Sequence, residues 1–242
     1  MTRLNWDVFS KKLGTWADKI YPFFLDGGMD TIYETLKTES KLGIRIVPNS
    51  EDVFRCFRKT PIEELKTVVM GFCPYHTIKN GEPVADGLMT SCSRTGILQP
   101  SLEQLYLAWE EEFNDGLCLN CDRNPDLLYL AKQGILLFNS ALTTRAGEAG
   151  AHQELWEPFT KYVMQEIIGV EGCPVLMLGK DAAIFEGYLG ITQWSYCLPH
   201  PVSASYKKEK WDSKGKFKEI SDVVRGANGY ELHWLLPMEA PF

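Results

Sequence analysis

The chain has 242 residues, of which 45% are hydrophobic and 24% are charged, and its formal net charge at pH 7 is −7. This composition is that of an ordinary globular protein whose core needs no disulfide or metal support. The negative charge excludes a surface that is basic all over, so any contact with nucleic acid must come from a local patch.

The amino terminus shows no targeting segment. Residues 1–16, MTRLNWDVFSKKLGTW, mix charged residues with single apolar ones and lack the apolar run and cleavage site of a signal peptide. No later run is long enough to span a bilayer. We therefore expect a cytoplasmic protein with no membrane partner.

The cysteines do not suggest a metal centre. Of the seven cysteines, only Cys118 and Cys121 form a CxxC pair. A zinc or iron–sulfur site of this kind needs further ligands at a matching spacing, and the sequence has no second pair. We expect no metal ion, and reduced thiols that are mostly buried.

Three apolar runs have the form of buried parallel strands, and each ends where polar residues begin. They cover residues 65–71, 134–139 and 174–179. In an open parallel sheet, ligands gather at the carboxyl ends of the strands. The segments that begin at Phe72, Asn139 and Lys180 should therefore converge on one crevice.

Two helices are predicted between and after these strands. Residues 101–113 begin with Ser101, which we expect to cap the helix, and carry apolar residues at helical spacing. Residues 152–168 place Leu155, Phe159 and Val163 on one helix face. No repeat or linker divides the chain, so the pattern predicts a single α/β domain over residues 1–242.

The segments at the strand ends resemble those of the family-1 uracil-DNA glycosylases, in the same order along nearly the whole chain. GFCPYHT at residues 71–77 is similar to the water-activating loop, which in the family reads Gly-Gln-Asp-Pro-Tyr-His-Gly. The other similar segments are ADGLMTSC at 85–92 (pocket), QPSLEQLY at 99–106 (proline–serine loop), 131–160 (base-reading strand and following helix), LPHPVSAS at 198–205 (His-Pro loop) and 218–234 (carboxyl-terminal helix). The resemblance implies a central four-stranded parallel sheet flanked by helices.

The resemblance also implies roles for the side chains that would hold the base. Asn139 stands where the family reads the pyrimidine edge, with one amide donor and one acceptor. His200, before Pro201, would donate a hydrogen bond to the base oxygen that gains negative charge. Tyr75 matches the ring that blocks bases substituted at C5. An Asn that caps a strand end and a purely structural His are the alternatives that the sequence leaves open.

Three loops are expected to contact the DNA backbone. Pro100 with Ser101 belongs to the proline–serine loop, and Lys180 follows the third strand. The His-Pro loop adds residues 203–205, which are Ser203, Ala204 and Ser205. Hydroxyl groups, backbone N–H groups and a local lysine can neutralise phosphates in spite of the negative net charge.

The most consequential departure from the family is Cys73, which replaces the water-activating Asp. A carboxylate about 4 Å from the sugar cation, at an effective dielectric constant near 20, stabilises it by about 4 kcal/mol. Its loss should slow the reaction about a thousandfold. Asp86, in the pocket segment, is the nearest substitute acid that the sequence offers. Phe72 replaces a Gln that, in the family, works largely through its backbone.

Two further departures change the pocket and the DNA wedge. Thr90 stands where the family stacks a Phe on the base, a contact of about 1 to 3 kcal/mol. Ala204 stands where a Leu wedge enters the helix, so about 1.5 to 3 kcal/mol of apolar insertion is missing. These changes favour a larger base, and DNA that is single-stranded or already destabilised.

The sequence therefore predicts a monomeric, monofunctional DNA glycosylase that extrudes a nucleotide and leaves an abasic site, in repair or in defence against viruses. The expected base is a modified pyrimidine, such as a hydroxymethylated or glucosylated one. No cofactor is expected, because glycosidic hydrolysis uses fixed dipoles and water. The alternatives are a degenerate glycosylase fold that binds DNA or protein, and base exchange with Cys73 as nucleophile and His76 as its base.

Overall fold

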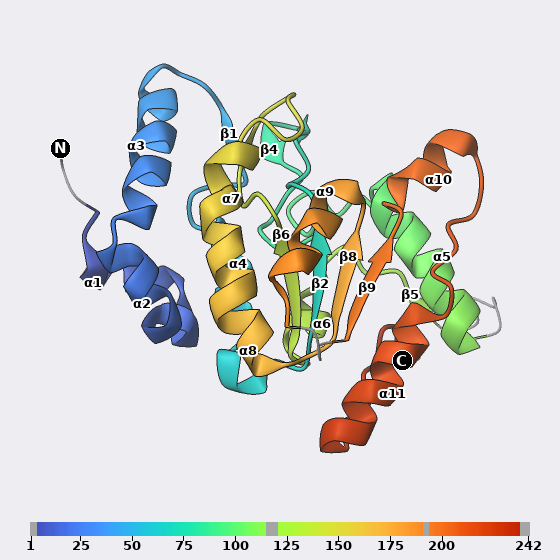
Figure 1. Ribbon diagram of the computed structural model, residues 1–242. Coiled ribbons are helices and arrows are strands. Elements are labelled where there is room, and N and C mark those ends of the chain that lie inside the picture. Colours follow the sequence, from blue (N-terminus) through green and yellow to red (C-terminus); the bar gives the residue numbers. More distant parts are fainter. Residues whose placement is uncertain (1–3, 115–120, 191–193, 238–242) are drawn as a thin grey trace, which may run out of the picture.

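The computed structural model describes residues 4–114, 121–190 and 194–237. A four-stranded sheet in the order β6-β2-β8-β9 lies at its centre (Figure 1), and all its strand pairs are parallel. The strands are β2 Thr67–Gly71, β6 Ile135–Asn139, β8 Val175–Leu178 and β9 Ser195–Leu198. The expected fold class is confirmed.

The three predicted apolar runs are strands because both of their faces are covered. Every residue of β2, β6 and β8 is buried, as expected for strands between two layers of helices. β9 was not among these runs, since it is an edge strand with half-exposed or exposed residues from Ser195 to Cys197. The register pairs Gly71 with Asn139, which brings two predicted site segments side by side.

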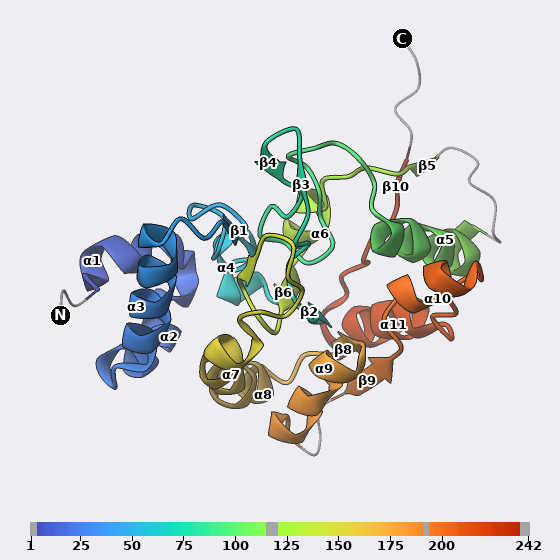
Figure 2. The same ribbon diagram turned by 90° about the horizontal axis from the view of Figure 1, so that it is seen from above.

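Helices cover both faces of the sheet. In Figure 2, α7 Gln153–Tyr162 and α8 Gly169–Glu171 lie on one side, and α5 Pro100–Asn114 and α11 Lys216–Asn228 lie on the other. A π-helical turn, Val163–Ile168, joins α7 to α8, so the predicted helix at 152–168 is interrupted. The remaining helices are α1 Trp6–Phe9, α2 Ala17–Leu25, α3 Gly28–Lys41, α4 Arg55–Lys59, α6 Leu128–Ala131, α9 Lys180–Ala183 and α10 Val202–Lys207.

Short antiparallel pairs complete the structure. They are β1 Ile46–Val47 with β7 Thr144–Arg145, β3 Ile78–Lys79 with β4 Glu82–Pro83, and β5 Cys121–Asp122 with β10 Leu236–Pro237. Cys118, the other half of the CxxC pair, lies outside the described residues. In the part of the chain that the structure describes, no helix is long and apolar enough to cross a membrane.

The expected cap of α5 is wrong. The helix begins at Pro100, and the backbone N–H of Glu103 donates to the carbonyl of Gln99 at 3.0 Å. Ser101 therefore lies inside the first turn and is buried. Proline is favoured as the first residue of a helix because its fixed φ suits the helix and its missing N–H would have no partner there.

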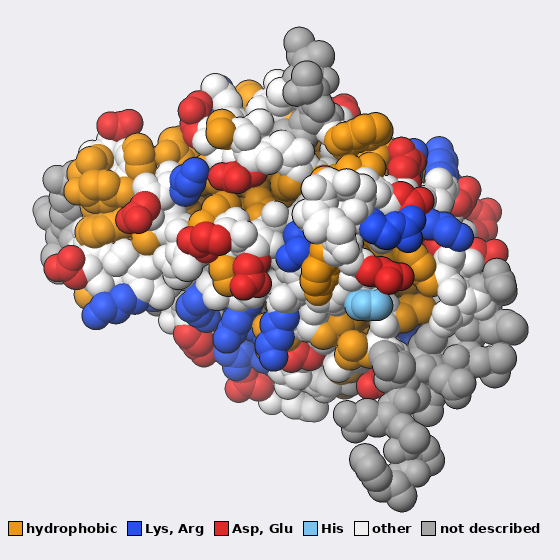
Figure 3. Space-filling view, turned by 90° about the horizontal axis from the view of Figure 1, so that it is seen from below, with side chains coloured by type: hydrophobic (Ala, Val, Ile, Leu, Met, Phe, Trp, Pro, Cys, Tyr) orange, Lys and Arg blue, Asp and Glu red, His pale blue; other side chains and the backbone are white. Residues whose placement is uncertain are grey.

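The face at the amino ends of the strands does not form a basic surface. Figure 3 shows this face, on which Lys and Arg side chains are interspersed with Asp and Glu. Mixed charges of this kind create no extended positive potential for a phosphate backbone. The polar segments follow the strands at the opposite end of the sheet, and ligands of open parallel sheets bind at that end.

Candidate active site

The predicted site residues follow the carboxyl ends of the sheet strands. Cys73 comes after β2, Asn139 ends β6, Lys180 opens α9 after β8, and His200 follows β9. These strands are neighbours and run the same way (Figure 1), so the four residues lie at the same end of the sheet, where the strands finish. A cavity of about 790 Å³ lies elsewhere, between α1, α3 and residues 44–54, and contains none of them.

The side-chain amide of Asn139 is available for hydrogen bonds to a bound group. It is 8% exposed, and its amide forms no hydrogen bond to any of the described residues. Its Oδ1 lies over Gly71, where an added Cβ would come within 2.8 Å of that oxygen. The amide is not among the buried polar atoms that lack a hydrogen-bond partner, so it retains contact with solvent at the end of β6. A side-chain amide in this position offers both donors and an acceptor to a bound group.

Backbone contacts join the segment after β2 to the segment after β6. The Ser140 N–H donates to the Gly71 carbonyl at 3.0 Å, and the Ala141 N–H donates to the Phe72 carbonyl at 3.0 Å. The Ser140 hydroxyl donates to the same Phe72 carbonyl at 2.7 Å. The Phe72 ring packs on Gly150, where an added Cβ would meet it at 2.5 Å. The Phe72 carbonyl therefore accepts two hydrogen bonds from residues 140 and 141, and its ring packs against the loop that follows β7.

Cys73 does not carry a negative charge at neutral pH. Burial is the main cause that raises the pKa of its thiol to about 11; a hydrogen bond with the Gly150 backbone lowers it in part, and the Asp181 carboxylate adds a smaller increase. At pH 7 the thiol is therefore protonated. Since the thiolate is the reactive form of cysteine, this site does not support base exchange with Cys73 as nucleophile.

His200 is held as a neutral hydrogen-bond donor. The Val202 backbone N–H donates to its Nδ1 at 3.2 Å, so in the neutral ring the proton is on Nε2. Burial lowers the pKa of His200, and Asp181 opposes this effect. Gly179, with φ +97, lets the loop come close, because an added Cβ would lie 3.1 Å from the His200 Cβ. The fixed Nε2–H suits an oxygen that gains negative charge.

Asp181 was missed by the sequence analysis. It is half-buried in α9, and its charge raises the pKa of both Cys73 and His200. The carboxylate therefore lies near both the position of the missing family Asp and the imidazole. Its place two residues after Gly179, at the end of a predicted strand, was the available signal. No motif of the resemblance covers it.

Several uracil-DNA glycosylases are similar to this chain. The one from Oceanobacillus iheyensis is 32% identical over 200 residues, which are 81% of this chain and 83% of that protein. The one from Xanthomonas axonopodis pv. citri is 30% identical over 226 residues, 92% and 90% of the two chains. The chain belongs to the uracil-DNA glycosylase family. The crystal structure of mimivirus uracil-DNA glycosylase has the same fold, with a TM-score of 0.81 at 20% identity over 96% of this chain and 90% of that one. No protein-family model matches the chain.

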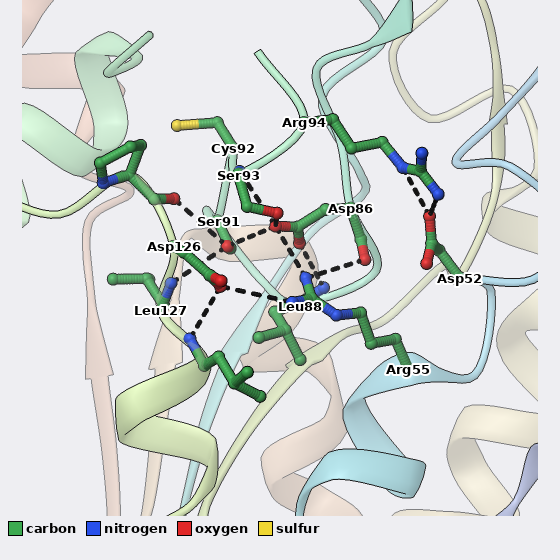
Figure 4. Close-up of polar contacts among 12 residues, drawn as sticks. Asp52, Arg55, Asp86, Leu88, Ser91, Cys92, Ser93, Arg94, Asp126 and Leu127 are labelled. Carbon is green, nitrogen blue, oxygen red and sulfur yellow. Dashed lines mark hydrogen bonds and ion pairs between the residues drawn. The ribbon is translucent and has the colours of Figure 1, made fainter. Parts of the chain in front are cut away.

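Within this family fold, Asp86 is part of the scaffold rather than a free acid. Its carboxylate is ion-paired with Arg55 at 2.8 Å and accepts hydrogen bonds from the Ser91 hydroxyl at 2.6 Å and the Leu88 N–H at 3.1 Å. Ser93 donates to it as well, and Figure 4 shows these groups converging on one carboxylate. Asp86 is 1% exposed. Its oxygens are already occupied, which removes the reason for treating it as a substitute for the family Asp.

Tyr75 and Thr90, the two residues expected to shape the base pocket, are both half-buried. The Tyr75 hydroxyl is buried beside Ser101 and Leu102 at the start of α5, and burial raises its pKa. Turning this ring away would therefore disrupt the packing at the start of α5. Thr90 is half-buried, its hydroxyl donates to the Met89 carbonyl at 2.8 Å, and its φ is 58. A β-branched residue in this left-handed region is strained, and such strain occurs at functional positions.

The residues expected to contact DNA differ in their accessibility. Pro100 and Lys180 are exposed, whereas Ser101 is 4% and Ala204 is 7% exposed. The two half-buried serines of the His-Pro loop make internal contacts. The Ser203 hydroxyl donates to the His200 carbonyl at 2.7 Å, and the Ser205 hydroxyl donates to the Pro100 carbonyl at 3.4 Å. Ser203 therefore bonds within the His200 loop, and Ser205 joins this loop to the proline–serine loop.

Proposed function

We propose that this chain is a DNA glycosylase that hydrolyses the N-glycosidic bond of a pyrimidine nucleotide and leaves an abasic site, as in base-excision repair. The proposal rests on the pairing of Asn139 with His200. Asn139 presents an amide, 8% exposed as a residue, that makes no hydrogen bond to the described residues, and His200, neutral with Nε2 protonated, lies at the same end of the sheet. A donor–acceptor pair and a fixed donor are what an extruded base requires.

The chemistry follows from where charge develops. The bond between C1′ of the sugar and N1 of the base breaks with its electron pair moving to the base, and water then adds to C1′. The His200 Nε2–H donates to the base oxygen that becomes negative, a contact of about 3 kcal/mol. The Asp181 carboxylate offers the negative charge for the sugar cation that the neutral Cys73 thiol cannot provide. The water loses its proton to solvent or to the departing base anion.

The base that the pocket favours is a pyrimidine without a large group at C5. The hypothesis of a hydroxymethylated or glucosylated base relies on the space opened by Thr90. That space replaces a ring that would stack on the face of the base, whereas a C5 substituent extends from its edge, where Tyr75 stands. Because the Tyr75 hydroxyl is buried against α5, we propose uracil as the substrate, bound weakly for lack of the stacking ring.

The decisive experiment offers the protein matched single-stranded oligonucleotides that carry uracil, 5-hydroxymethyluracil or 5-hydroxymethylcytosine and measures free base by mass spectrometry. Uracil release by the wild type, reduced at least a hundredfold in His200→Ala, supports the proposal. Preferential release of a hydroxymethylated base would show that Tyr75 moves and would restore that hypothesis.

The alternative is a degenerate glycosylase fold that binds DNA or protein without cleaving it. The neutral Cys73, the missing ring at Thr90 and the buried Ala204 favour it. Release of no base from any of these oligonucleotides, together with tight DNA binding that His200→Ala leaves unchanged, would establish this second function in place of the first.

A further inference from the structure

One large aromatic side chain near the site projects into solvent. Tyr206, in α10, is 82% exposed, more than any other large hydrophobic side chain in the described part of the chain. Single exposed apolar residues are common on protein surfaces. Tyr206 differs because it lies six positions after His200, on the loop that the resemblance associates with opening the DNA helix.

The direction of Tyr206 follows from the burial of Ala204. The two residues are about 200° apart around the helix, at 100° for each residue. Ala204 is packed in the core, so Tyr206 must point the opposite way. The position at which the family carries its wedge therefore faces inward in this chain. Position 206 faces solvent.

Hydrogen bonds anchor the backbone of the segment that carries Tyr206. The Glu209 N–H donates to the Ala204 carbonyl at 3.0 Å. Beyond α10, the Trp211 N–H donates to Gln104 Oε1 at 2.8 Å, and the Trp211 ring N–H donates to the Pro199 carbonyl at 2.9 Å. Trp211 thus fastens both ends of the segment that carries His200 and Tyr206. A platform fixed in this way loses little conformational entropy on binding.

The charge around Tyr206 complements a phosphate backbone. Lys207 and Lys208 follow it directly and are exposed, and neither forms an ion pair with any residue that the structure describes. Lys208 is the C-cap of α10 and adopts φ 56, so the chain turns directly after the helix. In a protein of net charge −7, these two lysines beside an exposed ring form a local basic and aromatic surface.

The spacing fits a DNA helix. From Val202 to Tyr206 the helix rises about 6 Å, and successive nucleotides along one strand are about 3.4 Å apart. The length of α10 from Val202 to Tyr206 therefore corresponds to about two nucleotide steps along one strand. Basic side chains with an aromatic ring are the usual means of holding bases after the stack has opened.

We infer that Tyr206 inserts into or stacks on the base step next to the extruded nucleotide, while Lys207 and Lys208 bind the flanking phosphates. The inference rests on the proposed function. In this chain Tyr206, and not the residue at the wedge position, Ala204, would separate the stacked bases. It also makes double-stranded DNA a substrate, in place of the single-stranded preference expected from Ala204 alone.

The test compares Tyr206→Ala with Tyr206→Phe under single-turnover conditions. The oligonucleotides carry uracil in a duplex, in a single strand, or in a duplex opposite an abasic position where the pair is already open. Tyr206→Ala should lower duplex cleavage about 5- to 150-fold. The open and single-stranded substrates should lose much less, and Tyr206→Phe should behave as the wild type. An equal loss on all three substrates, or none, overturns the inference.

A matched control is Tyr230→Ala. Tyr230 is also partly exposed, and Lys66 lies 4.3 Å above its ring, but Lys66 precedes β2 at the amino end of the sheet. This variant should cleave every substrate as the wild type does. Removing one phosphate contact with Lys207→Ser should reduce the salt dependence of duplex binding, by about one unit in the slope of log affinity against log salt. An unchanged slope would contradict the role of the lysine.

A second readout requires no base release, so it separates this inference from the proposed function. A 2-aminopurine placed next to the target brightens when its stack opens. Wild-type protein should raise its fluorescence in a duplex, and Tyr206→Ala should not. If the wild type opens the stack but releases no base, the wedge is correct and the glycosylase proposal is wrong. If the wild type cleaves duplex uracil without any fluorescence change, the wedge is wrong.

Discussion

Replacing Cys73 by aspartate puts a carboxylate at the carboxyl end of β2, beside the position proposed for the sugar. At about 4 Å from the sugar cation and an effective dielectric constant near 20, its attraction is worth about 4 kcal/mol, which is about a thousandfold in rate. Two local effects reduce this gain. The site is partly buried and Asp181 is close, and both raise the pKa of a group at this position, as they do for the thiol.

We therefore expect Cys73→Asp to release uracil from single-stranded DNA faster than the wild type, by a factor between about ten and a thousand. The rate should be measured at about pH 8, where the new carboxylate is ionised, on an end-labelled oligonucleotide with alkaline cleavage of the abasic product. Cys73→Asn, which matches the shape without the charge, is the control. If the aspartate and asparagine variants release uracil at the same rate and both are folded, the sugar does not lie beside residue 73 and the assignment of this loop fails.

Three other outcomes follow from the structure. Uracil release should fall as the pH drops through the pKa of His200, which lies below its usual 6.5, because only the neutral ring both accepts from Val202 and donates from Nε2. Asp181→Asn should move this limb of the pH–rate profile to lower pH, since Asp181 raises the pKa of His200. A shift to higher pH would contradict this electrostatic effect. Gly71→Ala should reduce turnover about a hundredfold, since its Cβ would lie 2.8 Å from both Asn139 Oδ1 and Met89 Cγ and misplaced groups lose rate on this scale. Wild-type kinetics would mean that turnover does not depend on how tightly this amide is placed. Asp86→Ala should destabilise the protein by about 3 to 5 kcal/mol in urea unfolding, because it leaves Arg55 without its buried partner. The pH dependence of turnover by the folded fraction should not change; loss of one limb of the pH–rate profile would return Asp86 to the chemistry.

The sheet could be predicted from sequence because its buried strands have a strong signature. β2, β6 and β8 lie within the predicted runs and begin one or two residues later than expected. The edge strand β9 lacks that signature, since one of its faces meets solvent. Helix boundaries are set by local groups, and the first turn of α5 was misplaced because Pro100 is as good a first residue as Ser101 is a cap.

Contacts between distant parts of the chain decided the remaining assignments. The sequence could not show that Arg55, thirty-one residues earlier, occupies the Asp86 carboxylate. Nor could it show that Asp181 acts on Cys73 and His200, because that depends on how α9 packs after β8. The direction of Tyr206 required the burial of Ala204, which no local pattern reports. In each case the residue type was visible, and its surroundings were not.

The closed set of contacts around Asp86 has a consequence for how this pocket can change. The buried Asp86 carboxylate fixes the turn from Leu88 to Ser93 through the Leu88 and Ser93 N–H groups and the Ser91 hydroxyl. Thr90 lies on that turn and contributes its hydroxyl only to the neighbouring Met89 carbonyl. A lineage can therefore exchange residue 90 while the turn keeps its shape. Because the contacts that hold the turn do not involve the Thr90 side chain, a substitution at this position should change the surface beside Asn139 more than the stability of the fold.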